Sequence, residues 1–160
     1  LPHLQGSGPP DYDPYAKGVI FGLTLAHTKQ HLSRAIMEGV TMVLRRMIDS
    51  TQQLGAEVSE IISLSGGSKS DAWCQIKADA TQLPVRTLKG AESAGCRGAA
   101  ILAGVAIGMW QSHTEIARKT LQFDREFKPD PGKAPVYDRL FTNYVRLQGL
   151  LQPMFVNDSV

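Results

Sequence analysis

The stretch Glu60–Asp79, EIISLSGGSKSDAWCQIKAD, decides which fold this chain can adopt. A short apolar run breaks at the pair Gly66-Gly67, and a helical pattern follows it. Two interpretations of the pair are open. It forms a tight turn with no further meaning, or it leaves the backbone bare so that a phosphate or a nucleotide can approach.

A strand that ends in two glycines before a helix has a geometry suited to anions. The first N–H groups of the helix lack partners, the helix dipole favours negative charge, and glycine has no Cβ to block the approach. Two better-known motifs are excluded. A P-loop needs Gly-Lys-Ser/Thr, but Ser68 precedes Lys69, and a Rossmann fingerprint needs another glycine long before Gly90. By itself, the motif therefore favours a plain structural turn.

The rest of the chain alternates helical and strand patterns, which is typical of an α/β layer architecture. Residues 1–18, rich in glycine and proline, predict a run of turns, and residues 122–136 predict an extended connection. Thr28 and Gly55 are expected to begin and end the first long helix, and Ser112 or Thr114 to cap a later one. We expect strands over 58–64 and 83–88, and helices over 31–54, 70–81, 92–108, 113–121 and 137–151.

The helix expected over 92–108 carries many small residues, among them Gly95, Gly98 and Gly104. A helix with so few large side chains is expected to pack its backbone closely against something flat, for which a sheet is the best partner. Two strands are too few for such a sheet, so further strands are expected from elsewhere. Because the start of the chain also resembles a loop in mid-protein, we expect a fragment.

Composition excludes several classes of function. The 160 residues are 42% hydrophobic and 20% charged, with a net charge of +2, and no basic run suggests a nucleic-acid partner. The longest apolar run, GAAILAGVAIGMW from Gly98, is too short to span a bilayer, so no membrane partner is expected. Cys74 and Cys96 are expected to be buried thiols of a reducing compartment, with a disulfide as the less favoured alternative, and the cytoplasm is the expected location.

The histidines and tryptophans predict structural roles. His3, His27, His31 and His113 share no metal-ligand spacing, so they are expected to be solvated or capping residues, and no metal site is predicted. Trp73 and Trp110 lie in apolar helical patterns and are expected in the core.

Several segments in order resemble the FGGY family of carbohydrate kinases. GVIFGLTLAHTKQHLSRAIMEG, from Gly18, resembles the C-terminal signature of the family. SGGSKSDAWCQIKADATQLPV resembles its adenosine segment, in which a Gln and an Asp, here Gln75 and Asp79, follow the glycines at fixed spacing. ESAGCRGAAILAGVAIGMW resembles its last small-residue helix, and FDREFKPDP resembles the tail connection of glycerol kinases. The segments cover nearly all of residues 6–148.

The resemblance implies a ribonuclease H-like, actin-like ATPase fold. The chain would supply, over residues 1–152, an incomplete part of the second, ATP-binding domain, with 153–160 as a tail. The whole enzyme would transfer the γ-phosphate of ATP, with Mg²⁺, to a small-molecule sugar or polyol bound by an upstream domain of the same protein. A homodimer is common in the family. The alternatives are a nonenzymatic actin-like nucleotide-binding module and an inactive fragment, and the isolated chain is expected to be inactive.

The resemblance also implies a nucleotide contact at the glycine turn, which includes Ser68. Gly66 and Gly67 would lie against the ribose and the α-phosphate, and Ser70 and Asp71 would flank the adenine. Many relatives have Asn at the position of Asp71; an Asp can accept from the adenine amino group but cannot also donate. Substituting valine for Gly67 is therefore expected to weaken ATP binding with little change in folding.

No catalytic residue is assigned, because in the family the base lies upstream of this segment. Asp11 and Asp13 are interpreted as turn residues, and Glu92 as an acid at a helix start, with an approach to the nucleotide as the less favoured alternative. Gln75 and Asp79 are expected to hold their helix to its surroundings, and Glu38 to be a structural carboxylate. GSGPP, from Gly6, resembles glycerol kinases more than pentulose kinases, so the sugar or polyol stays open.

Overall fold

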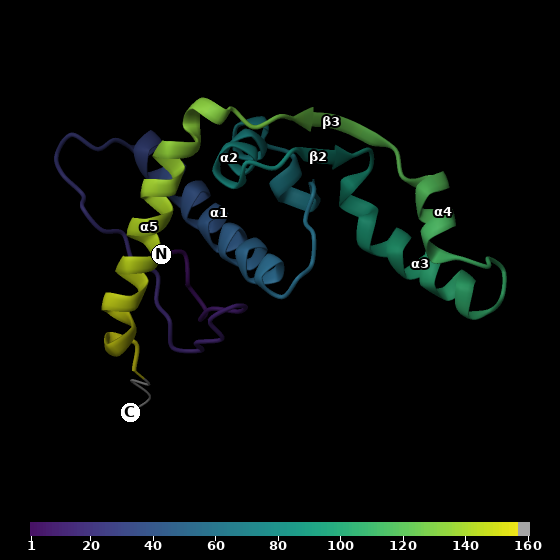
Figure 1. Ribbon diagram of the computed structural model, residues 1–160, viewed down its shortest axis with the longest axis horizontal. Coiled ribbons are helices and arrows are strands. Elements are labelled where there is room, and N and C mark those ends of the chain that lie inside the picture. Colours follow the sequence, from purple (N-terminus) through teal and green to yellow (C-terminus); the bar gives the residue numbers. More distant parts are fainter. Residues whose placement is uncertain (157–160) are drawn as a thin grey trace. The chain divides into compact units, whose positions relative to one another are not determined.

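The chain divides into two units in the computed structural model, which describes residues 1–156 (Figure 1). Unit 1 contains Leu1–Val58, Asp79–Gln82 and the residues from Asp130 on, and unit 2 contains Ser59–Ala78 and Leu83–Pro129.

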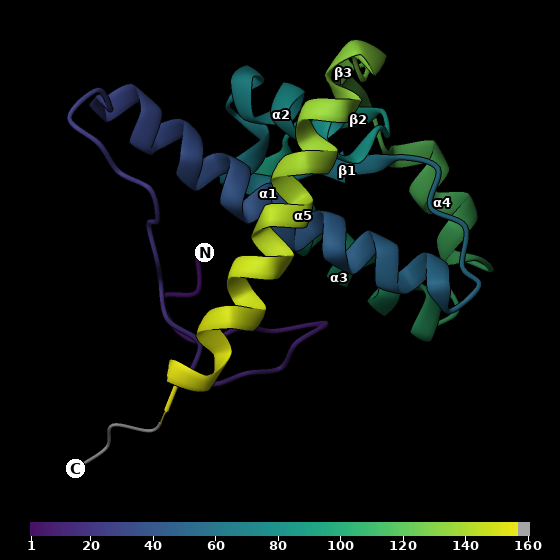
Figure 2. The same cartoon turned by 60° about the vertical axis from the view of Figure 1, so that its left-hand side comes forward.

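Unit 1 is built on two long helices, α1 (Lys29–Gln53) and α5 (Ala134–Leu151), which lie across each other (Figure 2). Tyr137 and Tyr144 are seven residues apart, so they share one face of α5. They form a buried cluster with Met42 of α1 and with Ala80. The turns of residues 1–18 are confirmed.

The ends of α1 follow the signals in the sequence. Thr28 is the N-cap residue, and its backbone N–H donates to Nδ1 of His31 at 3.1 Å. Gly55 follows the end of the helix with φ +86°, a conformation that glycine adopts readily. The predicted cap, stop and capping histidine are therefore confirmed.

Unit 2 is built on a sheet in the order β1-β2-β3 (Figure 1). Strands β1 (Ile61–Ser63) and β2 (Val85–Leu88) pair in parallel, and helix α2 (Asp71–Thr81) makes the crossover that parallel strands require. Cys74 and Ala78 of α2 pack with Val85 in a second buried cluster. The last residues of α2 belong to unit 1.

The third strand, β3 (Phe123–Phe127), was not predicted, because we expected an extended connection over these residues. It pairs antiparallel with β2, with Phe127 opposite Val85. Three successive charged residues separate the two phenylalanines, so the sequence lacks the alternation that marks a half-buried strand. Pairing with β2, and not local pattern, makes this segment a strand.

The prediction that the small-residue helix packs on a sheet with strands from elsewhere stays a prediction. Helix α3 (Ala94–Ala106), which follows the 3₁₀ helix η2 (Ala91–Ser93), packs beside α4 (His113–Thr120). Gly95 and Gly98 are exposed. Gly104 is buried, and a Cβ there would lie 2.4 Å from the ring of Trp110, so only glycine fits at this position. Ser112 caps α4 by accepting from the N–H of Glu115 at 3.4 Å.

Burial differs from the expectation at four residues. His3 is buried, not solvated, and its Nε2 lies 3.1 Å from the hydroxyl of Tyr144. Cys74 is buried as expected, but Cys96 is exposed, and both are free thiols. Trp73 and Trp110 were expected in the core, but both are only half-buried.

Two predictions concern the membrane and the end of the chain. Within residues 1–156, no helix is both long and apolar enough to cross a membrane. The predicted tail, 153–160, starts inside the 3₁₀ helix η4 (Gln152–Met154), and residues 157–160 lie outside the described part. The remaining short helices are η1 (Ser65–Ser68) and η3 (Pro131–Lys133).

Candidate functional site

The glycine pair lies in η1, between β1 and α2. In this turn Ser65 has a positive φ of 54°, whereas neither Gly66 nor Gly67 lies in the positive-φ region that favours glycine. Glycine is required where φ is positive or where another group comes close. The backbone conformation therefore does not explain why either position is glycine, and the interpretation as a plain turn loses its main support.

The two glycines differ in the space around them. A Cβ built on Gly67 would lie 3.1 Å from Nζ of Lys77, so a neighbour within the protein already occupies that side. A Cβ built on Gly66 would meet no atom within 4 Å. Of the pair, Gly66 is thus the glycine whose missing side chain no described residue accounts for.

The other three predicted site residues lie in the same short segment. The buried Ser68 hydroxyl donates to the carbonyl of Ser65 at 2.7 Å and so closes the turn. The Ser70 hydroxyl accepts from the N–H of Trp73 at 3.3 Å, at the start of α2. Asp71 is exposed and forms an ion pair with Arg125 of β3. The structure brings the predicted residues together, and their contact with a nucleotide stays a prediction.

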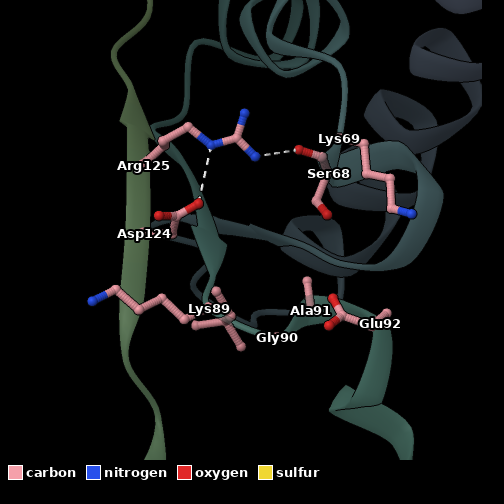
Figure 3. Close-up of a pocket in the computed structure, with 9 residues that line it drawn as sticks. Ser68, Lys69, Lys89, Gly90, Ala91, Glu92, Asp124 and Arg125 are labelled. Atoms are coloured by element: carbon pink, nitrogen blue, oxygen red, sulfur yellow. Dashed lines mark hydrogen bonds and ion pairs between the residues drawn. The ribbon is translucent and has the colours of Figure 1, made fainter.

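Arg125 is the residue of this site that the sequence did not reveal. Its Nη2 donates to the carbonyl of Ser68 at 2.8 Å, and its Nε donates to Asp124 at 3.2 Å (Figure 3). One guanidinium therefore joins β3 to the end of η1 and, through Asp71, to the first turn of α2. Because β3 was expected to be a connection, no signal placed Arg125 next to the glycines.

A cavity of about 320 Å³ lies beside this turn, at the carboxyl end of β2 (Figure 3). Ligands of α/β proteins commonly bind at the carboxyl ends of parallel strands. Lys69 and Lys89 are exposed on its walls, and neither ammonium forms an ion pair within residues 1–156. Polar and charged side chains predominate among its lining residues, which are Ser68, Lys69, Leu88, Lys89, Gly90, Ala91, Glu92, Asp124 and Arg125.

Gln75 and Asp79 hold α2 to its surroundings, as predicted. Nε2 of Gln75 donates to the carbonyl of Lys128 at 2.9 Å. The carboxylate of Asp79 accepts from the backbone N–H of Asp130 at 3.0 Å and from Nζ of Lys133 at 2.8 Å. Both residues serve the fold and lie apart from the cavity walls.

Three other acidic residues, Glu38, Asp11 and Asp13, also have structural partners. Glu38 accepts from Nε of Arg34 at 2.8 Å, which confirms its structural role. Asp11 pairs with Arg46 at 2.7 Å. The carboxylate of Asp13 accepts from a backbone N–H two residues further on, at 2.9 Å, as a turn residue does. In the described part of the chain, no three His, Cys, Asp or Glu side chains gather where they could hold a metal ion.

Comparisons with known proteins agree with the resemblance. Residues 1–107 match the model of the FGGY family of carbohydrate kinases, C-terminal domain. The chain is 34% identical over 143 residues to a xylulose kinase of Bacillus subtilis, covering 89% of this chain and 28% of that protein. It is 36% identical over 145 residues to a glycerol kinase of Borrelia hermsii, covering 88% and 28%.

A solved structure confirms the fold class. The crystal structure of a gluconate kinase from Lactobacillus acidophilus superposes with a TM-score of 0.83 at 31% identity, covering 97% of this chain and 31% of that one. The chain thus spans less than a third of the length of each of these relatives. It has the fold of part of an actin-like ATPase domain, and it belongs to the FGGY family of carbohydrate kinases.

Proposed function

We propose that the protein is an ATP-dependent carbohydrate kinase, in which this chain supplies part of the ATP-binding domain and η1 binds the nucleotide. The acceptor would be a hydroxyl group of a small sugar or polyol, held by an upstream domain of the same protein. A cytoplasmic location and a homodimer belong to the same proposal. Membership of a kinase family supports the reaction class.

The observation that carries the proposal is the bare backbone at Gly66. Its φ does not require glycine, and no described atom would meet a Cβ there. A ligand that lies directly against the backbone would leave no room for a side chain, and this would explain the glycine. The N-terminus of α2 begins a few residues further on, and the positive end of its dipole favours a phosphate.

The neighbouring residues suit a nucleoside polyphosphate. Gly66 and Gly67 would face the ribose and the α-phosphate, and the exposed ammonium groups of Lys69 and Lys89 would attract the phosphate charge. Asp71 would flank the adenine with Ser70. An ionised carboxylate has about four acceptor sites, so Asp71 can bind Arg125 and still accept from the adenine amino group.

Catalysis in this proposal rests on positioning and on neutralising charge, because phosphoryl transfer needs little covalent help from the protein. When bound, Mg²⁺ supplies positive charge to the phosphate oxygens. We propose that Mg²⁺ enters bound to the phosphates of ATP. Domain closure would exclude water from the reaction. No residue of this chain is proposed as the base.

Calorimetric titration of Mg·ADP into the full-length protein, with a Gly66→Val variant, tests the site. The variant is expected to fold normally, since space is open, but to bind at least about tenfold more weakly, or 1.4 kcal/mol. Gly149→Val is the matched control, because that glycine of α5 is equally unobstructed. Gly67→Val is a poorer test than the sequence suggested, because the new side chain would press on Lys77.

Each outcome has a distinct meaning. Equal affinity of the wild-type and Gly66→Val proteins would show that the nucleotide binds elsewhere. A phosphotransfer assay with a panel of sugars and polyols then tests the reaction. Binding of Mg·ATP without transfer to any of them would instead favour the nonenzymatic actin-like module.

A further inference from the structure

Lys77 joins three parts of the glycine turn with one ammonium group. Its Nζ donates to the hydroxyl of Ser63, the last residue of β1, at 2.8 Å. It also donates to the carbonyl of Gly67 in η1 at 3.1 Å. The same ammonium lies 4.7 Å from the ring centre of Trp73, within the range of a cation–π contact.

Stability does not readily explain a lysine at this position. Lys77 is half-buried, and burial lowers the pKa of its ammonium, since the charged form loses water. Well-packed apolar side chains often replace partly buried charges with no loss of stability. A methionine has a similar length and flexibility and could fill the same space.

The ammonium instead constrains the backbone of the turn. Gly67 has no side chain, and a Cβ there would crowd the ammonium at 3.1 Å. The Gly67 carbonyl also accepts from the thiol of Cys74 at 3.5 Å, so two side chains of α2 hold it. Because a peptide bond is planar, holding this carbonyl fixes the whole plane between Gly67 and Ser68.

We propose that Lys77 is a positioning residue for nucleotide binding. It holds the peptide plane that follows the glycine pair, so that η1 keeps the shape in which the bare backbone of Gly66 faces the ligand. This inference rests on the proposed nucleotide site. Lys77 acts through Gly67 and makes no contact with the nucleotide itself.

A Lys77→Met substitution in the full-length protein tests the inference. The affinity for Mg·ADP, measured by calorimetry, should fall about fivefold, the loss expected for one hydrogen bond. The midpoint of thermal unfolding should change little, because removal of a partly desolvated charge offsets the loss of its two hydrogen bonds. Lys77→Arg should recover most of the affinity, since a guanidinium keeps the charge and the donors.

The control is Lys119→Met in α4, which removes an exposed lysine of the same unit that pairs with Glu115, one helical turn away. It should leave the affinity unchanged. Wild-type affinity in Lys77→Met would overturn the inference, as would parallel losses of affinity and unfolding temperature without rescue by arginine. Absence of Mg·ADP binding by the wild-type protein would overturn the proposed function, and this inference with it.

Discussion

Replacing Asp79 with asparagine should destabilise unit 1, because a buried carboxylate contributes more to the free energy of unfolding than an exposed one does. Asp79 is 2% exposed, and its carboxylate accepts from the N–H of Asp130 at 3.0 Å and from Nζ of Lys133 at 2.8 Å. Asparagine has the same size but no charge. Its carbonyl oxygen can still accept from one of the two donors. Its NH₂ group is itself a donor, so it cannot accept the hydrogen bond from the other.

The magnitude follows from these contacts. A hydrogen bond to a charged group contributes about 1.5–3 kcal/mol. Lys133 is about half exposed and regains water when the pair breaks, so the cost at Asp79 should lie near the lower end, at about 1.5–2 kcal/mol. For a domain of this size, that corresponds to a decrease of roughly 3–8 °C in the midpoint of unfolding.

Urea denaturation of the 160-residue chain, followed by circular dichroism, measures the change in free energy, and a thermal melt measures the change in the midpoint. The matched control is Asp138→Asn, which makes the same substitution in an ion pair with Arg45 at 2.6 Å. The Asp138 side chain is 59% exposed, so its loss should change the free energy of unfolding by no more than about 1 kcal/mol. An Asp79→Asn protein no less stable than the control would refute the argument from burial.

Two further changes test other contacts. Burial lowers the pKa of His3 below its ordinary value of 6.5, because the charged imidazole loses water. The neutral, buried imidazole should therefore stabilise the fold fully above pH 6.5, and this stabilisation should be lost as the pH falls through the lowered pKa. In His3→Gln, the free energy of unfolding should therefore depend less on pH below neutrality. The same slope in the wild-type and variant proteins would contradict this. Ser112→Ala removes the cap of α4 and should cost about 0.5–2 kcal/mol, measured by denaturation, whereas Ser112→Gly should cost only a few tenths.

Local signals could be predicted from the sequence because the responsible atoms are near in the chain. Thr28 and Gly55 mark the ends of α1, and Ser112 caps α4, through contacts a few residues away. The glycine turn was located from its own sequence, whereas Gln75 and Asp79, whose partners lie about fifty residues further on, were assigned to holding α2 only through the family resemblance.

Features that depend on distant partners could not be predicted. Strand β3 exists because it pairs with β2, about forty residues earlier, while its own sequence is mostly charged. His3 is buried against Tyr144, at the other end of the chain. The difference between Gly66 and Gly67 depends on the ammonium of Lys77, whose direction no sequence pattern specifies.

The three-stranded sheet of unit 2 also affects how the 160-residue chain would behave in solution. In the described part, β1 and β3 each pair with one neighbour, so each presents a free row of peptide groups. The free edge of β3 carries charged side chains that discourage further pairing, whereas β1 is short and mainly apolar, with Ile62 40% exposed. Precipitation during purification should therefore begin at β1, and a lysine in place of Ile62 should delay it.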